Sequence, residues 1–312
     1  MSEAVAEAVP SRWLGIGLVL TSGCCWGFHG VLIKFGLGMG ASFLQVFFFE
    51  VILATCFFGS FYRYFFTPVR PQGWSQWWRL LAIGFATIGV GTFLFMSFSL
   101  GPVAIPATLM FLYLPVVYAF SVLSGNQRFS GVKLGAILLI LVGAVLTTEI
   151  LSSLDQPGVI GAALAALAAS ASYAVVFVLT PEVGAYTTLP FRSFAVSFIG
   201  ALGCVVIFLC VPSLWFPLGE NAVRFGIFAL FLGVIGQALP VVTLMKGLPL
   251  TGGSLGGVLA SVELPIAVFS AAILLGESLH PLKIFGVALV FSGIVAYNFA
   301  DQLRPSLRAK AL

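Results

Sequence analysis

Ten long apolar segments follow one another along the chain, with only short polar stretches between them. They cover residues 13–33, 43–65, 79–99, 103–123, 132–150, 159–180, 190–211, 223–245, 253–275 and 282–300. Each is close to the roughly 20 residues that an α-helix needs to cross the hydrocarbon core of a bilayer. The sequence therefore predicts an all-α membrane protein with ten transmembrane helices and no separate soluble domain.

The composition excludes several classes of protein. Of the 312 residues, 60% are hydrophobic and only 8% are charged, whereas a soluble domain carries about 25% charged residues. A soluble enzyme, a nucleic-acid binder and a disordered protein are thereby ruled out. The five cysteines all lie in apolar runs, with the spacing of neither a metal site nor a disulfide framework. We expect no metal and no cofactor.

The positions of the basic residues predict how the helices are oriented in the membrane. With the N-terminus inside, eleven of the fourteen Lys and Arg fall on the cytoplasmic side, and only Lys34, Arg224 and Lys283 fall outside. Basic residues near the ends of spans are retained in the cytoplasm. Both termini are therefore expected to be cytoplasmic, with residues 1–12 and 301–312 as short tails.

The two halves of the chain resemble each other. Residues 109–145 can be laid on 259–295 without a gap at a constant offset of 150. This offset pairs Pro115 with Pro265, Lys133 with Lys283 and Gly143 with Gly293. Five spans is an odd number, so a second five-span unit must enter the membrane from the opposite side. We expect a five-plus-five inverted repeat, with units at 13–150 and 159–300, as is common among secondary transporters.

Prolines within the spans predict bends around a central cavity. Pro106 and Pro115 interrupt the fourth span, Pro240 the eighth and Pro265 the ninth. Proline cannot donate to the carbonyl one turn earlier and bends the helix, and irregular backbone at membrane depth is tolerated only against protein or water. These four prolines are the predicted kink and gating positions.

Ionisable residues deep in spans are costly and usually functional, and here they are His29, Glu50 and Glu263. Glu263 lies two residues before Pro265, as its repeat mate Tyr113 lies two before Pro115. His29 shares a helix face with Trp26 and is a candidate for binding substrate or carrying a proton. Glu50 is interpreted as a buried partner of His29 or Arg192.

The residues expected to line a substrate-binding cavity combine these groups with tyrosine, tryptophan and neutral polar side chains. Trp26 and Tyr173, at corresponding places in spans 1 and 6, are expected to form walls that contact an amphipathic substrate through apolar and cation–π interactions. The predicted set is Trp26, His29, Thr108, Tyr113, Tyr173, Gln237, Ser254, Ser261 and Glu263.

Several short motifs resemble those of a known family. They are Trp26-Gly27, Lys34 at the end of the first span, Leu-Pro in spans 4 and 9, and Gly276-Glu277 closing span 9. In these residues the chain resembles the drug/metabolite transporter superfamily, within it the EamA-type ten-helix exporters, and most of all the YddG-type amino-acid exporters. It departs from them at Glu50, where family members often carry Arg. The resemblance implies a multi-pass protein of the plasma membrane, which in bacteria is the inner membrane.

Together these features favour a secondary transporter that exports amino acids and related small amphipathic metabolites by alternating access. No Gly-x-x-x-x-Gly-Lys-Ser/Thr loop is present, so a gradient must supply the energy. Export of amphipathic cations or drugs is the alternative within the class. A membrane-embedded enzyme is the alternative outside it, although two Asp and two His do not supply metal or acid clusters. A passive channel is disfavoured by the internal repeat. The expected partners are a small-molecule substrate and lipid, with no nucleic acid and no required oligomer.

Overall fold

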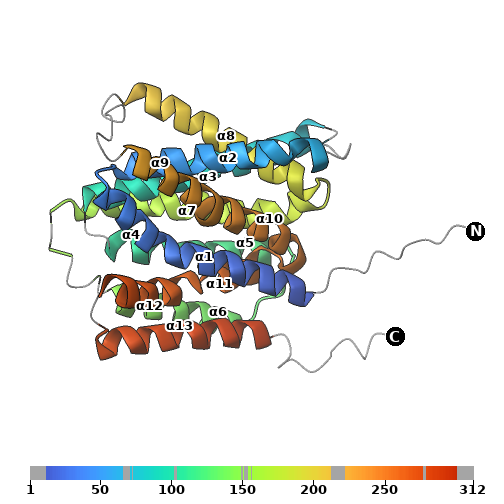
Figure 1. Ribbon diagram of the computed structural model, residues 1–312. Coiled ribbons are helices and arrows are strands. Elements are labelled where there is room, and N and C mark those ends of the chain that lie inside the picture. Colours follow the sequence, from blue (N-terminus) through green and yellow to red (C-terminus); the bar gives the residue numbers. More distant parts are fainter. Residues whose placement is uncertain are drawn as a thin grey trace, which may run out of the picture.

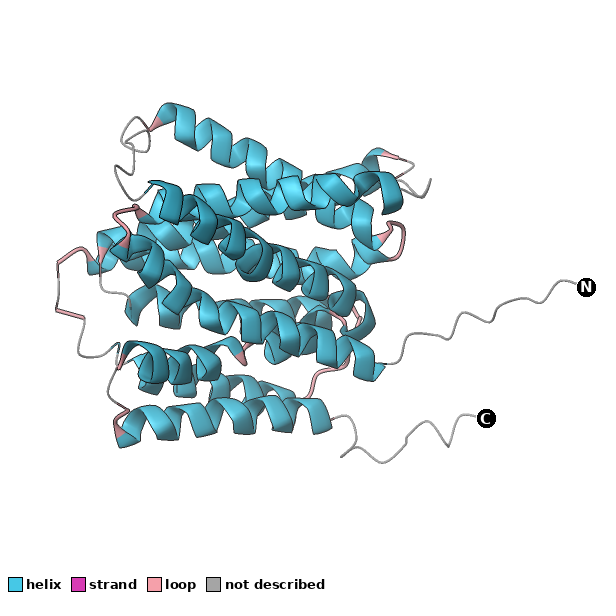
Figure 2. Ribbon diagram, viewed as in Figure 1, coloured by secondary structure: helices cyan, strands magenta, loops and turns pink. Residues whose placement is uncertain are grey.

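The computed structural model describes residues 12–65, 71, 73–101, 104–148, 150, 154–155, 157–211, 222–276 and 279–300, and regular structure in these residues is helical (Figures 1 and 2). The helices of the first half are α1 (Arg12–Gly38), α2 (Phe43–Phe65), α3 (Trp74–Leu100), α4 (Ala104–Leu109), η1 (Met110–Leu112), α5 (Tyr113–Leu123) and α6 (Gly131–Thr148). Those of the second half are α7 (Val159–Gly184), α8 (Leu189–Cys210), α9 (Ala222–Phe231), η5 (Leu232–Ala238), α10 (Leu239–Thr251), α11 (Gly253–Ala260), α12 (Glu263–Leu275) and α13 (Pro281–Phe299). The predicted tails, 1–12 and 301–312, lie outside the described residues apart from Arg12.

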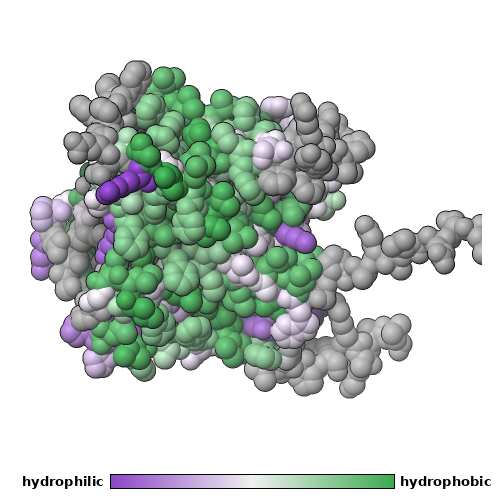
Figure 3. Space-filling model, viewed as in Figure 1, coloured by the Kyte–Doolittle hydropathy of each residue, from purple (hydrophilic) through white to green (hydrophobic). Residues whose placement is uncertain are grey.

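The helices have the length and the surface of membrane spans. Nine helical segments of the described chain are long and apolar enough to cross a bilayer. The remaining one is α2, whose most apolar part, Leu44–Ser60, is shorter, although the helix itself continues to Phe65. Large apolar side chains face outwards over most of the visible surface (Figure 3), Ile160 and Ile273 being 79% and 78% exposed. The predicted fold class, an all-α membrane protein with ten spans, is confirmed.

The packing of the spans is that of an inverted repeat. Counted in chain order, span 1 (α1) packs on span 8 (α10) as span 6 (α7) packs on span 3 (α3). Span 1 likewise packs on span 9 as span 6 packs on span 4. The remaining spans pair with their own counterparts, α2 with α8 and α6 with α13. Helix α1 begins and α13 ends at the same end of the bundle (Figure 1). The two halves are therefore exchanged by a two-fold relation, as the odd number of spans requires.

Spans 4 and 9 are broken at equivalent positions. In span 4 the turn η1 separates α4 from α5, which begins at Tyr113; in span 9 a turn at residues 261–262 separates α11 from α12, which begins at Glu263. Pro115 and Pro265 are each the third residue of the second half-helix. The Ser261 carbonyl, which the ring of Pro265 cannot serve, accepts instead the Leu264 N–H at 3.1 Å. The turn in span 9 therefore leaves the Ser261 carbonyl satisfied.

Span 8 is irregular in a different way and is longer than predicted. Residues Leu232–Ala238 form a wide π-helical turn just before Pro240. The span then continues as α10 to Thr251 and passes through Pro249, so the predicted end at residue 245 is wrong. A proline does not end a helix when another group satisfies the carbonyl that it leaves free.

Close packing of α6 on α13 depends on glycine. A Cβ added at Gly143 would lie 2.6 Å from the Gly286 carbonyl oxygen, and one added at Gly293 would lie 2.6 Å from the Ala136 carbonyl oxygen. These two positions are repeat mates, so the same close approach occurs twice across the interface. At Gly135, also on α6, an added Cβ would meet nothing within 4 Å. Small residues let membrane helices approach closely where lipid supplies no hydrophobic driving force.

We therefore expect Gly143→Ala to lower the free energy of unfolding by about 1–3 kcal/mol, because the backbones of α6 and α13 must move apart. Thermal unfolding of purified protein in detergent measures the effect. Gly135→Ala adds the same methyl group to the same helix and serves as the control. Equal stability of the two variants would contradict this account of the interface.

Candidate functional site

A cavity lies between the two repeats. Most of the residues that line it come from the middle of their helices. Its volume is about 120 Å³, several times the roughly 10–15 Å³ that one water molecule requires. Every span contributes to its wall except those formed by α6 and α13, which pair with each other at one side of the bundle. Apart from tryptophan and tyrosine, its polar lining side chains are His29, Glu50, Thr87, Ser197, Gln237 and Glu263.

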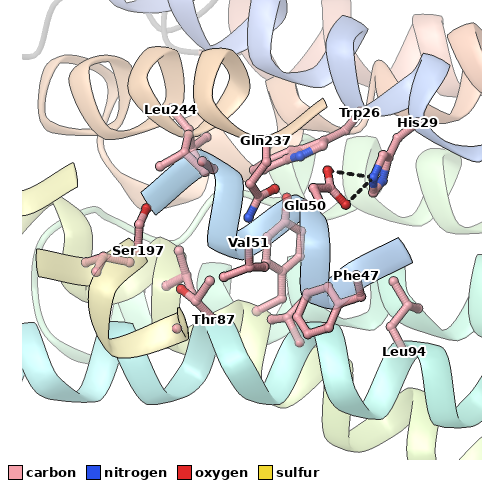
Figure 4. Close-up of a pocket in the computed structure, with 18 of the residues that line it drawn as sticks. Trp26, His29, Phe47, Glu50, Val51, Thr87, Leu94, Ser197, Gln237 and Leu244 are labelled. Carbon is pink, nitrogen blue, oxygen red and sulfur yellow. Dashed lines mark hydrogen bonds and ion pairs between the residues drawn. The ribbon is translucent and has the colours of Figure 1, made fainter. Parts of the chain in front are cut away.

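Aromatic rings form much of the cavity wall. Trp26 of α1 and Tyr173 of α7 meet edge to face, with ring centroids 6.2 Å apart. On the opposite wall Phe47 of α2 packs against Phe95 of α3 at 5.0 Å. The Phe47 ring occupies the space over Gly91, where an added Cβ would lie 1.9 Å from its Cζ. The absence of a side chain at Gly91 therefore lets Phe47 lie against α3 beside the cavity (Figure 4).

His29 and Glu50 form an ion pair across α1 and α2. The His29 Nε2 atom lies 2.8 Å from Oε1 and 2.9 Å from Oε2 of Glu50 (Figure 4). Gly236 of the π turn gives this pair its space, since an added Cβ would lie 3.0 Å from Glu50 Oε1. Glu50 is 1% exposed, and a charge so deeply buried requires a partner. The predicted pairing of Glu50 with His29 is confirmed, whereas Arg192 binds backbone carbonyls instead.

Glu263 is held differently from Glu50. It is the first residue of α12, directly after the break in span 9, and it lines the cavity. The N-terminus of a helix carries a partial positive charge that favours a carboxylate. Within the described chain Glu263 makes no hydrogen bond and no ion pair; the ion pairs found there join His29 to Glu50 and Arg79 to Glu182. Its carboxylate is therefore open to a ligand in the cavity.

Comparison with known proteins identifies the family. Residues 13–149 and 160–299 each match the EamA-like transporter family. The chain belongs to the EamA-like transporter family. It therefore carries two EamA repeats and is a multi-pass membrane transporter of the drug/metabolite superfamily rather than an enzyme. In many transporters built from inverted repeats the substrate site lies at the interface between the repeats, and this cavity lies at such an interface.

A solved structure supports the fold. The chain is similar to a protein of known crystal structure, with a TM-score of 0.73, 17% sequence identity, and coverage of 94% of this chain and 100% of the other. At this level of identity the likeness concerns the fold alone. A search of curated proteins found no match.

Of the nine residues predicted to line the cavity, five do so in this EamA fold. The π turn brings Gln237 to the cavity, and the break in span 9 brings Glu263 there. The five are Trp26, His29, Tyr173, Gln237 and Glu263. Their role in binding substrate stays a prediction.

The other four predicted residues lie outside the lining, and each satisfies its hydroxyl within the packed bundle. Tyr113 is 1% exposed and donates to the Gly257 carbonyl at 2.7 Å. Ser261 donates to the Val258 carbonyl at 2.5 Å. Thr108 is hydrogen-bonded to Thr148 of α6. Ser254 is hydrogen-bonded to Tyr297 of α13 and to Gln127, which lies in the connection between α5 and α6.

The four predicted kink prolines fall into three groups. Pro115 and Pro265 follow the matching breaks of spans 4 and 9, and Pro240 follows the π turn. Pro106 was expected to interrupt span 4, but it lies in the first turn of α4, where no intrahelical N–H is needed. None of the four lines the cavity, and their part in gating stays a prediction.

Several lining residues were not predicted from the sequence. Thr87 of α3, Ser197 of α8 and Met110 of η1 are examples. Their residue types are common in membrane spans, and Thr87 satisfies its hydroxyl on the Ile83 carbonyl of its own helix. Only the spacing of helices around the cavity distinguishes them, and a single sequence does not contain that information.

The buried ion pair leads to a double-mutant test. Removal of one partner leaves an uncompensated charge, so we expect His29→Ala to lower the free energy of unfolding by about 3–5 kcal/mol. His29→Ala combined with Glu50→Gln removes both charges and should recover most of this loss. Denaturation in detergent measures all the variants. Additive effects of the two single substitutions would show that the pair does not couple.

Proposed function

We propose that this EamA-family protein exports amino acids and related small amphipathic metabolites as a secondary transporter. The observation that carries the proposal is the unpaired carboxylate of Glu263 in a cavity between the two repeats. A carboxylate in that position complements the ammonium group of an amino acid. The resemblance of the chain's short motifs to those of the YddG-type amino-acid exporters points to the same substrate class.

The surroundings of Glu263 suit an ammonium group attached to an apolar body. Trp26 and Tyr173 line the same cavity and present aromatic faces that attract a cation. The rest of the wall is mostly aliphatic, with Val51, Val90 and Leu244 among the lining residues. Gln237 and Ser197 project into this space and supply neutral hydrogen-bonding groups (Figure 4). A small amphipathic molecule therefore finds both a charged anchor and an apolar wall.

Alternating access follows from the inverted repeat. Two similar units with opposite orientation have two related arrangements, each closing the cavity on one side of the membrane. The broken spans 4 and 9 lie in equivalent positions of the two units. In passing from one arrangement to the other, these two spans therefore exchange their roles. A gradient of the substrate or of protons would drive the cycle.

The basic residues support an orientation with both termini in the cytoplasm, in the plasma membrane or its bacterial equivalent, the inner membrane. In this orientation Ser124, between α5 and α6, faces the cytoplasm, and Asp155, before α7, faces outwards. Both residues are exposed in short connections.

A cysteine at each of these two positions tests the orientation. In a cysteine-free background, a membrane-impermeant maleimide added to spheroplasts should label Asp155→Cys, while Ser124→Cys should react only after the membrane is permeabilised. The reverse pattern would invert the proposed topology.

Export of amphipathic cations is the second candidate, and one observation favours it. Two carboxyl groups, those of Glu50 and Glu263, line the cavity, and His29 is the one basic side chain among the described lining residues. Such a lining is complementary to an amine that lacks a carboxylate. Counterflow in liposomes with labelled amino acids and with labelled hydrophobic amines separates the two candidates.

The proposal predicts the effect of Glu263→Gln. Loss of a charge-assisted hydrogen bond to an ammonium group should raise the KM for amino-acid counterflow about tenfold or more, with the fold intact. Glu182→Gln, which removes a carboxylate paired with Arg79 outside the cavity lining, is the matched control and should keep the wild-type KM. An unchanged KM in Glu263→Gln would remove Glu263 from the binding site.

A further inference from the structure

Arg192 is a cation buried close to the cavity, and the transport site described above does not use it. It lies in the first turn of α8, and 5% of its surface is exposed. One turn further along α8, Val196 lines the cavity. A guanidinium buried at this depth loses its hydration and is normally compensated by a carboxylate.

The partners of Arg192 are neutral. Its Nε and Nη2 atoms donate to the Met245 carbonyl at 3.0 and 2.6 Å, and Nη1 donates to the Thr187 carbonyl at 3.0 Å. No carboxylate of the described chain pairs with it. A guanidinium has five N–H groups, and these bonds occupy three of them.

Part of this arrangement has a structural explanation. Pro249 lies inside α10 and has no N–H for the carbonyl four residues earlier, which is that of Met245. Arg192 supplies the missing donors and so allows α10 to continue past Pro249. A neutral donor such as glutamine would serve a neutral carbonyl equally well, so the positive charge is not explained by this bond.

Two hydroxyl groups of residues close to Arg192 in the sequence have no protein partner. Thr188 Oγ1 and Ser193 Oγ are buried and make no hydrogen bond in the described structure. Thr188 is the N-cap residue of α8 but makes no capping bond, and Ser193 is 1% exposed. Buried hydroxyls without partners are costly. These two hydroxyls and the two remaining N–H groups of Arg192 are thus unused donors of three residues at the start of α8.

This cluster has the composition of an anion site. Its members are all hydrogen-bond donors, and it lies at a helix N-terminus, where the free N–H groups add a partial positive charge. Met245, whose carbonyl Arg192 binds, is itself a lining residue of the cavity. Arg192 is therefore in direct contact with a residue of α10 that lines the substrate cavity.

We propose that Arg192, with Thr188 and Ser193, forms a subsite for the carboxylate of the transported amino acid. The inference rests on the proposed function and extends it, since Glu263 accounts only for the ammonium group. In the structure described, the Met245 and Thr187 carbonyls occupy the guanidinium. In the proposed transport cycle the part of α10 that carries Met245 moves away from Arg192. The substrate carboxylate then replaces the two carbonyls and forms stronger bonds with the guanidinium, because it is itself charged.

The experiment must separate carboxylate binding from the support of α10, and Pro249 makes this possible. Pro249→Ala restores an N–H for the Met245 carbonyl, so Arg192→Met combined with Pro249→Ala removes the cation while keeping that carbonyl satisfied. Four variants are purified and reconstituted in liposomes: Arg192→Met, Arg192→Lys, Pro249→Ala and the double variant. Their thermal stability is measured, and so is their counterflow of labelled leucine, phenylalanine, methionine and lysine. Arg79→Met, which removes a basic residue paired with Glu182, is the control for charge.

We expect the double variant to match Pro249→Ala in thermal stability, but to have a KM for amino acids raised about tenfold or more and a maximal rate close to that of the wild type. Arg192→Lys should lie between the two, because an ammonium keeps the charge and loses the planar fork. Arg79→Met should keep the wild-type KM.

Two results would overturn the proposal. One is a wild-type KM in the double variant, which would reduce Arg192 to a donor for the Met245 carbonyl. The other is failure of the double variant to fold when Pro249→Ala folds, which would make the role of Arg192 structural. A wild-type protein that moves none of the four amino acids would instead refute the proposed function itself, and this result is read before any variant is made.

Discussion

Lipid offers no hydrogen bonds to the polypeptide backbone, and this constraint determines where the chain is irregular. A proline beyond the first turn of a helix leaves a carbonyl without its usual N–H donor, and another arrangement of the protein compensates for it. At Pro265 a tighter turn supplies the Leu264 N–H, and at Pro249 the guanidinium of Arg192 supplies side-chain donors. Next to Pro240 the helix widens into a π turn. The breaks in spans 8 and 9 bring Gln237 and Glu263 to the cavity. The same irregular segments that satisfy the backbone therefore also place side chains of the candidate site.

Most of the fold was predictable because each span must be long and apolar, which a sequence records directly. The inverted repeat followed from the odd number of spans and from pairs such as Pro115 with Pro265. The end of α10 was not predictable in the same way. Pro249 and Lys246 indicate the end of a span by local rules, yet α10 continues to Thr251. The group that permits this, Arg192, lies in a different helix, and local sequence does not reveal such a contact.

The ionisable members of the candidate site were its most predictable part. His29, Glu50 and Glu263 all line the cavity, because the cost of a charge in lipid confines such residues to the interior of the bundle. Hydroxyl groups carry no such information, since a serine or threonine can satisfy itself on a carbonyl of its own helix at small cost. Ser261 does so on Val258, and Thr87 does so on Ile83. The first lies outside the cavity and the second lines it, although their local bonding is alike.

The charges around the cavity bear on which kind of substrate the protein carries. His29 and Glu50 pair with each other, and within the described protein neither Glu263 nor Arg192 forms an ion pair with an oppositely charged side chain. An amphipathic cation would complement only the first, and an organic anion only the second, so either would leave one buried charge uncompensated. A zwitterion complements both. Because an uncompensated buried charge is costly, the presence of both groups in one bundle supports the proposal of an amino acid over that of an amine.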